Sequence, residues 1–335
     1  MSDAMRAVGY RKSLPISDPE SLVDVEVPIP AIGPHDLLVQ VEAVSINPAD
    51  TKVRLGNNPG GKIKIIGYDA AGVVTAVGEK VTRFTVGDEV WYAGSVRRQG
   101  TNAQFHAVDE HVVGHKPASL SFAEAAALPL ATITAWETLE KYPLESRKRA
   151  GGTLLVLGGA GGVGSSLIQL ARALTDLTVV ATASRPESAK WATDLGAHHI
   201  ANHHNLVESV FEVAPEGVDY VLSPFSEHVI NDLATIVRPG GHVVAIDEPE
   251  GLELLPLKDK SISWHWEWMF TRPVFAPTDP AQHELLEQAA RLVDEGRLRT
   301  TLTTQLGPIN AATLRDAHAR VEGFTTIGKI VVAGW

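Results

Sequence analysis

The chain has 335 residues, enough for about two domains at roughly 150 residues each. It carries 29 Lys+Arg against 40 Asp+Glu, a formal charge of −11 that repels a phosphate backbone, so we exclude nucleic-acid binding. The absence of cysteine excludes disulfides, thiol nucleophiles, iron–sulfur clusters and thiolate zinc sites. No apolar run reaches about 18 residues and residues 1–10 lack an apolar stretch, so we expect a cytoplasmic protein without a membrane span or signal peptide.

Short β-strands are predicted for the first third of the chain. Residues 36–47 place apolar side chains at every second position, and residues 70–77 are apolar on both faces. Residues 87–91 start another strand after a turn, and Gly or Pro separates the segments. A small β-barrel or folded sheet fits this region.

The pattern changes at Ser121, which forms a capping box with Glu124 and predicts a helical stretch toward Lys141. Strands and helices then alternate, which is typical of a parallel sheet covered by helices on both faces. These elements are strands at 153–157, 178–183, 218–222 and 242–246, and helices at 163–174 and 186–195. Ser184 is the expected N-cap of the second helix and Gly196 its stop.

Two amphipathic helices, at 279–296 and 309–322, and a strand at 329–332 close the chain. The predicted fold is therefore α/β, with a doubly wound Rossmann domain inserted in a β-rich domain. We place the β-rich domain at residues 1–126 and 268–335, and the Rossmann domain at residues 127–267.

A glycine-rich turn of the form G-x-G-x-x-G joins the strand at 153–157 to the helix at 163–174. The first glycine permits the tight turn, the second lets the backbone approach a pyrophosphate, and the third allows helix–strand packing. The helix N-terminus then offers free N–H groups to the diphosphate. The predicted dinucleotide-binding residues of this loop are Gly159, Ala160, Gly161, Gly162, Val163 and Gly164.

The end of the next strand predicts which nucleotide binds. An acidic residue there would indicate NAD, but the strand at 178–183 ends in Ser184-Arg185, with Lys190 about one helical turn beyond. A guanidinium pairs well with a 2′-phosphate, so we predict NADPH, unless Arg185 is an ordinary surface residue. Ser223, Phe225 and Ile246 end later strands and either flank the cofactor or are plain loop residues.

Together these segments resemble the medium-chain dehydrogenase/reductase superfamily, in particular its zinc-free quinone oxidoreductases and the branch labelled "zinc-type alcohol dehydrogenase-like". The matching segments, in family order, are 47–50 (NPAD), 67–74 (GYDAAGVV), 77–78 (VG), 86–90 (VGDEV), 128–129 (LP), 134–136 (TAW), 266–271 (WEWMFT) and 328–331 (GKIV), besides the glycine loop. The resemblance covers essentially the whole chain. It implies a GroES-like catalytic domain around the Rossmann domain, and a homodimer formed by the cofactor domains.

The resemblance places the catalytic zinc ligands of metal-dependent members at Asn47, Tyr68 and Leu130. None supplies a thiolate, and the four-cysteine structural zinc loop expected after Trp91 is missing, so we expect no zinc. Without a metal, hydride can still pass from NADPH to an electron-poor acceptor such as a quinone or an α,β-unsaturated carbonyl.

Asn47 is then the candidate hydrogen-bond donor to the acceptor carbonyl, although it could merely cap the turn before Pro48. Tyr68 is a candidate hydrogen-bond or proton donor, or else a buried aromatic. Asp50 is the third catalytic candidate, with a structural role as the stronger alternative. By resemblance Thr134 lies against the nicotinamide ring, unless it is an ordinary helix residue.

Trp266, Glu267 and Phe270 are candidates for the acceptor pocket, although a run of aromatic residues more often belongs to the hydrophobic core.

A separate histidine cluster suggests a metal site at first sight. Strand alternation should split its members across two faces, so we expect no native metal there. The cluster consists of His198, His199, His203 and His204.

The predicted function is NADPH-dependent, zinc-independent hydride transfer to quinones or related electron-poor carbonyl compounds. One alternative is double-bond reduction of alkenals or enones, with hydride going to the β-carbon. The other is a non-catalytic NADPH-binding protein, since relatives of this family also serve as lens proteins. The expected partners are a small-molecule quinone or enone and a second copy of the chain, with neither nucleic acid nor membrane.

Overall fold

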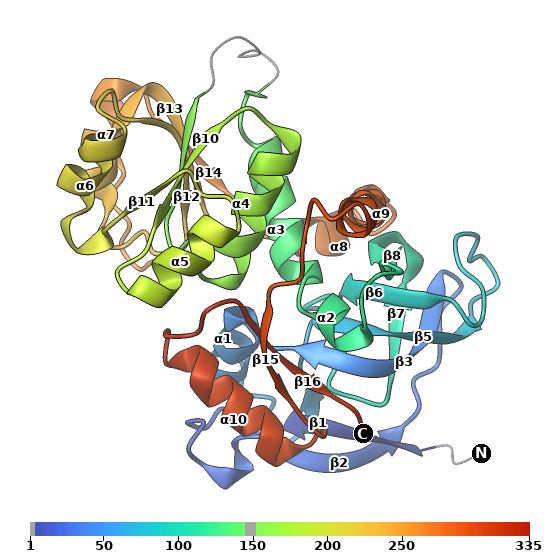
Figure 1. Ribbon diagram of the computed structural model, residues 1–335. Coiled ribbons are helices and arrows are strands. Elements are labelled where there is room, and N and C mark those ends of the chain that lie inside the picture. The colour runs from blue at the N-terminus through green and yellow to red at the C-terminus, as the bar shows by residue number, and fades with distance from the viewer. Residues whose placement is uncertain (1–3, 145–151) are drawn as a thin grey trace. The chain divides into compact units, whose positions relative to one another are not determined.

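The computed structural model describes residues 4–144 and 152–335 (Figure 1). The chain forms two compact units: a first unit of residues 1–133 and 270–335, and a second of residues 134–269. The sequence placed the corresponding boundaries at 126/127 and 267/268. Helix α3 (Pro129–Glu140) runs through the first junction, where a helical pattern alone offers no sign of a boundary.

The first unit is built on a mixed sheet in which both ends of the chain take part. Its strand order is β15-β16-β3-β5-β6-β8, with β7 also paired to β3, and a separate three-stranded sheet has the order β2-β1-β4. The strands are β1 (Ala4–Tyr10), β2 (Val23–Pro28), β3 (Asp36–Ser45), β4 (Lys64–Ile65), β5 (Asp69–Val77), β6 (Glu89–Ala93), β7 (Phe105–Asp109), β8 (Val113–His115), β15 (Leu302–Leu306) and β16 (Lys329–Ala333).

Strand β3 is the centre of this sheet because it pairs with β5, β7 and β16. Its inward side chains Leu37, Val39 and Val41 are fully buried in the main core of the unit, as the period-two pattern predicts. The helices of the unit are α1 (Pro48–Gly56), α2 (Phe122–Ala126), the start of α3, α8 (Thr271–Phe275), α9 (Ala281–Asp294) and α10 (Ala311–Glu322). Short 3₁₀ turns η1 (Pro19–Ser21) and η2 (Glu110–Val112) complete it.

The second unit is a parallel six-stranded sheet with the order β11-β10-β9-β12-β13-β14. Its elements are β9 (Thr153–Val156), α4 (Gly162–Leu174), β10 (Thr178–Thr182), α5 (Pro186–Asp194), β11 (His199–Ala201), η4 (His203–Asn205), α6 (Leu206–Val213), β12 (Val218–Ser223), α7 (Ile230–Ile236), β13 (Val237–Ala245), η5 (Leu255–Lys260) and β14 (Ser263–Trp266). The order corresponds to 3-2-1-4-5-6 in a doubly wound fold.

Strand order reverses between β9 and β12, and this reversal determines where a ligand can bind. Right-handed crossovers put α4 and α5 on one face and α6 and α7 on the other. Helices α6 and α7 share one apolar cluster with the strands, which includes Leu206, Leu233 and Val221. All six residues of β12 are buried, as expected for a strand covered on both faces. The carboxyl ends of β9 and β12 therefore form a topological switch point.

Two local predictions were wrong. The helical stretch from Ser121 is two helices, α2 and α3, because Pro129 lacks an N–H and begins a new helix. The capping box of Ser121 and Glu124 itself is confirmed. Ser184 is not the N-cap of α5; Arg185 is, and its backbone N–H is satisfied by the Ser188 hydroxyl at 3.3 Å.

Candidate active site

The glycine loop lies where the fold requires a phosphate site, between β9 and α4. A Cβ on Gly159 would come within 2.7 Å of the Ala181 Cβ, and one on Gly164 within 2.4 Å of the Gly158 carbonyl oxygen. A Cβ on Gly161 would meet nothing closer than 3.4 Å, so this backbone stays open to a ligand. Helix α4 begins after Gly161 with no side-chain cap. The loop therefore fits the pyrophosphate of a dinucleotide, whose oxygens would meet the helix N–H groups.

Ser184 and Arg185 are exposed at the tip of β10, and their predicted contact with the ribose end of the cofactor stays a prediction. Thr182, at the end of the strand, accepts the Gly158 N–H at 2.9 Å and so ties this tip to the glycine loop. The Lys190 ammonium lies 2.7 Å from Asp194, one turn further along α5, in an exposed ion pair. Arg185 directly follows the strand end at Ser184, and its contact with a 2′-phosphate stays a prediction.

The ends of β12 and β13 are joined by a small polar network. Backbone N–H of Ile246 donates to the Ser223 carbonyl at 3.0 Å, and the Ser223 and Ser226 hydroxyls lie 3.0 Å apart. Asp247 accepts from the Ser226 hydroxyl at 2.7 Å, a contact that the sequence analysis missed. Phe225 is 56% exposed, and its ring lies 3.5 Å from where a Gly158 Cβ would be, so it borders the glycine loop.

A cluster of buried polar side chains lies in the first unit, where α1, β5 and β16 meet. The Asn47 amide Nδ2 donates to Asp69 Oδ2 at 2.8 Å, and Asn47 Oδ1 accepts from the Lys329 ammonium at 2.5 Å. Lys329 lies 3.3 Å from Asp69 Oδ2 and also donates to the Ile46 carbonyl at 2.8 Å. The backbone N–H of Leu130 donates to Asp69 Oδ1 at 2.7 Å.

Burial raises the pKa of Asp69 and lowers that of Lys329, while the attraction between the two opposes both shifts. Their separation and their shared contact with Asn47 support an ion pair, because each charge is stabilised by its partner. Sequence analysis assigned no role to either residue. The sequence did contain one indication of this pair: a lysine is the first residue of the otherwise apolar strand at 329–332.

Asn47 and Asp50 also shape the start of α1. Asn47 is the N-cap residue, Pro48 occupies the first turn, and Asp50 accepts the Asn47 backbone N–H at 2.7 Å. Burial raises the pKa of Asp50 to about 7, and its Oδ1 is buried with no hydrogen-bond partner in the part of the chain that the structure describes. The structure confirms that Asn47 caps the helix and shows that it belongs to the polar cluster, while its role as donor to an acceptor carbonyl stays a prediction. Asp50 has the structural contact that the alternative predicted.

Tyr68 follows Gly67, whose φ of +105° is open mainly to glycine. The Tyr68 ring is buried and lies 4.7 Å, centroid to centroid, from the ring of Phe270. Burial and the nearby Asp50 carboxyl raise the pKa of Tyr68 well above its usual value. The phenol therefore keeps its proton and can act as a hydrogen-bond donor.

The three residues predicted to line the acceptor pocket belong to different units. Phe270 reaches Tyr68, as just described. In the second unit Trp266 is 52% exposed at the end of β14, whereas Glu267 is buried and pairs with Lys141 at 2.9 Å. Thr134 is buried on α3 within the second unit.

The donor set at the three zinc-ligand positions does not fit zinc. Asn47 Oδ1 faces the Lys329 ammonium, Leu130 contributes only a backbone N–H, and the Tyr68 phenol keeps its proton. A divalent cation there would have to displace a buried ammonium, and it would find no thiolate.

Within the described residues, no three ligand atoms of the histidine cluster lie close enough together to hold one ion. Both ring nitrogens of His198 are engaged, one by the Val179 backbone N–H and one by Arg172. Over residues 4–144 and 152–335, the one metal-type grouping is His35, Glu110 and His111. Its carboxylate already accepts from His35 and from the backbone of Thr82 and Arg83.

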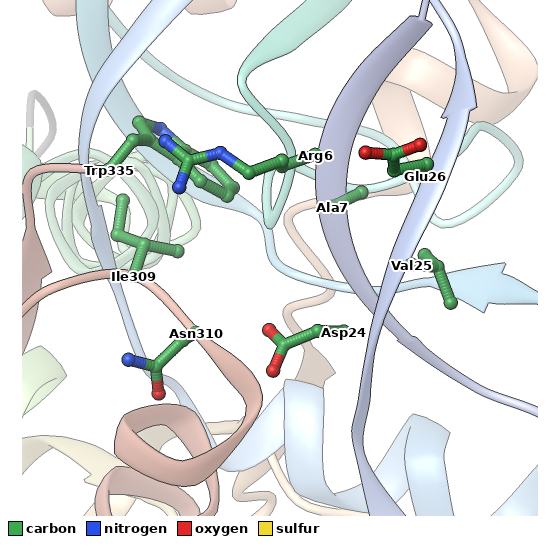
Figure 2. Close-up of a pocket in the computed structure, with 8 residues that line it drawn as sticks. All are labelled: Arg6, Ala7, Asp24, Val25, Glu26, Ile309, Asn310 and Trp335. Atoms are coloured by element: carbon green, nitrogen blue, oxygen red, sulfur yellow. The ribbon is translucent and has the colours of Figure 1, made fainter.

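A surface hollow of ≈ 390 Å³ lies elsewhere on the first unit (Figure 2). Arg6 lies 5.9 Å from the Trp335 ring, and Asp24 accepts the Ala311 N–H at 2.9 Å. Arg6 and Asp24 therefore have partners within the protein. None of the residues that line the hollow belongs to the cluster around Asn47. The residues lining the hollow are Arg6, Ala7, Asp24, Val25, Glu26, Ile309, Asn310 and Trp335.

Comparison with known families identifies the family to which the chain belongs. A family profile described as "Alcohol dehydrogenase GroES-like domain" matches residues 33–137, and one described as "Zinc-binding dehydrogenase" matches residues 195–332. A Staphylococcus epidermidis "zinc-type alcohol dehydrogenase-like protein" is 34% identical over 98% of this chain and 99% of its own length. The chain belongs to the medium-chain dehydrogenase/reductase superfamily, a family of NAD(P)-dependent oxidoreductases. The predicted family and fold class are thus confirmed.

Other relatives differ in their named activities. A Solanum lycopersicum "2-methylene-furan-3-one reductase" is 33% identical over 92% of this chain and 74% of its own length. A Rhizobium etli structure, provisionally named a zinc-dependent alcohol dehydrogenase, matches with a TM-score of 0.96 at 50% identity, covering 100% of this chain and 99% of its own. A Pseudomonas syringae quinone oxidoreductase matches with a TM-score of 0.84 at 26% identity, covering 98% of this chain and 99% of its own.

No helix in the described part of the chain is long and apolar enough to cross a membrane.

Proposed function

We propose that this chain is an NADPH-dependent, zinc-independent reductase of electron-poor conjugated carbonyl compounds, quinones or enones. The observation that carries this proposal is the Asn47–Asp69–Lys329 cluster, in which a neutral hydrogen-bond donor lies beside an internal cation. By resemblance, Asn47 stands at the position of a zinc ligand in metal-dependent relatives. Acceptors that are already electron-poor need only such modest stabilisation of the developing oxyanion. Unactivated alcohols and ketones would need a stronger Lewis acid.

NADPH, when bound, supplies the hydride. The glycine loop and the N-terminus of α4 bind its pyrophosphate, and Arg185 contacts its 2′-phosphate. Asn47 donates a hydrogen bond from Nδ2 to the acceptor oxygen, where negative charge develops. Tyr68 donates a second hydrogen bond rather than a proton, because its raised pKa makes it a weak acid. Water is then the proton source for the product.

The test measures NADPH consumption without oxygen against 1,4-benzoquinone, 2-alkenals, 2-cyclohexenone and simple ketones. We expect turnover with conjugated acceptors and not with simple ketones. Asn47→Ala should lower kcat by about 10²-fold, the usual effect of one oxyanion donor. Tyr68→Phe should have a smaller effect, and both variants should bind NADPH normally. Asn231→Ala, at an exposed position on α7, is the matched control.

Two alternatives are separated by the same assay. Turnover restricted to 2-alkenals and enones would favour double-bond reduction, the chemistry that the name of the tomato relative suggests for that protein. NADPH binding without turnover of any acceptor would favour a non-catalytic protein. Full activity in both Asn47→Ala and Tyr68→Phe would contradict the assigned carbonyl contacts.

We also propose a homodimer formed through the second units. Among the described strands, β14 is the last of this sheet and pairs on one side with β13. An unprotected edge strand can pair with the same strand of a second copy. Exposed Trp266 lies at the end of this strand and would be covered in such a pair.

A further inference from the structure

The Lys329 ammonium cannot itself serve an acceptor molecule. An ammonium has three N–H donors, and Lys329 has three protein acceptors: the Ile46 carbonyl, Asn47 Oδ1 and Asp69 Oδ2. Its side chain is only 5% exposed. All of its donors are therefore used inside the protein, and any influence on the reaction has to pass through a neighbour.

That neighbour is Asn47, and the cluster determines which way its amide faces. Lysine can only donate, so the amide atom 2.5 Å from Lys329 Nζ is the oxygen. A carboxylate can only accept, so the atom 2.8 Å from Asp69 is the amide nitrogen. A rotated amide would put NH₂ against the ammonium and oxygen against the carboxylate. One Nδ2–H binds Asp69, and the second is the proton that Asn47 can offer an acceptor.

We propose that Lys329 and Asp69 are positioning residues that hold Asn47 as a donor and strengthen it. This role rests on the proposed function, in which Asn47 binds the acceptor oxygen. A buried positive charge at the amide oxygen draws electron density toward it and makes the amide N–H groups stronger donors. The paired carboxylate stabilises the ammonium and fixes the geometry. A cation built into the chain thereby acts on the acceptor through one intervening amide.

The test is a double-mutant cycle in which the ion pair is neutralised as a unit. Asp69→Asn combined with Lys329→Met removes both charges of the pair, so neither member is left buried without its partner. We expect kcat to fall by about tenfold or more, a fraction of the loss from deleting an oxyanion donor, with the affinity for NADPH unchanged. Added to Asn47→Ala, the same pair of substitutions should change kcat by less than about twofold. A full loss in the Asn47→Ala background would overturn the proposal, because the pair would then act independently of Asn47.

Lys116→Met is the matched control. Lys116 is also a buried lysine side chain, paired with Glu89 at 3.1 Å in the same unit. Its loss should lower thermal stability without changing kcat. If Lys116→Met reduced kcat as strongly as the neutralised pair, general destabilisation would explain both results and the proposal would be wrong.

A second readout needs no turnover, so that failure of the proposed function can be told apart from failure of this inference. In protein labelled with ¹⁵N-asparagine, the Asn47 side-chain amide is assigned by its absence in Asn47→Ala. The wild-type signal should show strong protection from hydrogen exchange, and the neutralised pair should lose that protection and shift the signal. An unchanged signal would overturn the positioning role even if no acceptor were ever reduced.

Discussion

Several charged or titratable side chains of the first unit are buried, and they differ in how well their polar atoms are hydrogen-bonded. Arg54 is fully buried, donates to the Leu14 carbonyl and pairs with Glu322 at 2.5 Å. His318 on α10 is fully buried too, but neither of its ring nitrogens has a hydrogen-bond partner among residues 4–144 and 152–335. Burial, with nearby Arg54, lowers the pKa of His318 to about 3. This imidazole therefore stays neutral and leaves its polar atoms unsatisfied.

We predict that His318→Leu stabilises the protein. An unsatisfied buried polar group costs about 1–3 kcal/mol, which leucine avoids at similar volume. The folded pKa lies below the unfolded value of about 6.5, so the wild type loses stability as pH falls from about 6.5 toward 3. The advantage of His318→Leu should therefore grow by about 2 kcal/mol between pH 7.5 and pH 5. Urea unfolding at both pH values measures it, with exposed His228→Leu as the control.

Arg185 carries the second prediction at this scale. Arg185→Asp should weaken NADPH binding far more than NADH binding, because a carboxylate repels the 2′-phosphate that only NADPH carries. Buried charge-assisted bonds would be worth about 1–3 kcal/mol, and the exposed position of Arg185 puts the effect near 1 kcal/mol, roughly fivefold in Kd. Fluorescence titration measures both constants, with Lys190→Ala as the comparison. If Arg185→Asp weakened the binding of NADPH and of NADH equally, Arg185 would not contact the 2′-phosphate.

Elements are joined in the first unit by contacts that respond to pH. His115 on β8 lies 2.8 Å from Glu287 on α9, and its ring packs 4.7 Å from that of Phe84. The hydrogen bond to Glu287 raises the pKa of His115, and Asp88 at 3.7 Å adds to this. His115 and its backbone hydrogen bond to Glu287 in turn hold the pKa of that carboxyl low, against the effect of burial. The strand–helix contact is thus strongest when the imidazole is charged and the carboxyl ionised.

This gives a prediction for the pair. Stability from His115 is fully present below its unfolded pKa of about 6.5 and is lost as pH rises through its raised folded value. His115→Gln should therefore lower the free energy of unfolding at pH 6 and have little effect at pH 9. Because the His115 side chain is 45% exposed, we expect no more than about 1 kcal/mol. A loss of the same size at both pH values would indicate packing against Phe84 rather than charge.

At the scale of the whole molecule, the first unit depends on segments from both ends of the chain. Strand β16 pairs antiparallel with β3, Val332 opposite Val44. The inserted second unit has a core of its own, built on β9, β10, β12 and β13. Each unit thus has the apolar interior that a separate domain needs.

The proposed dimer is tested at this scale. Light scattering should give twice the chain mass of 35.9 kDa. Trp266→Glu should shift the protein toward the monomer, because it puts a charge at the edge strand that the partner would cover. Phe275→Glu is the control, since Phe275 is 72% exposed but lies in the first unit. A monomeric wild type, or a dimer indifferent to Trp266→Glu, would contradict this interface.

The sequence by itself determined the features that depend on local physics. The glycine loop, the alternation of strands and helices, and the cation at the tip of β10 were all predicted, because dihedral preference and side-chain periodicity act over a few residues. Asn47 and Tyr68 were proposed as site residues from a resemblance, and their roles remain predictions. Only the tertiary structure decided what surrounds Asn47, because Asp69 and Lys329 lie 22 and 282 residues away from it. A buried ion pair joins strands whose neighbourhood results from packing of the whole unit, and no local pattern carries that information.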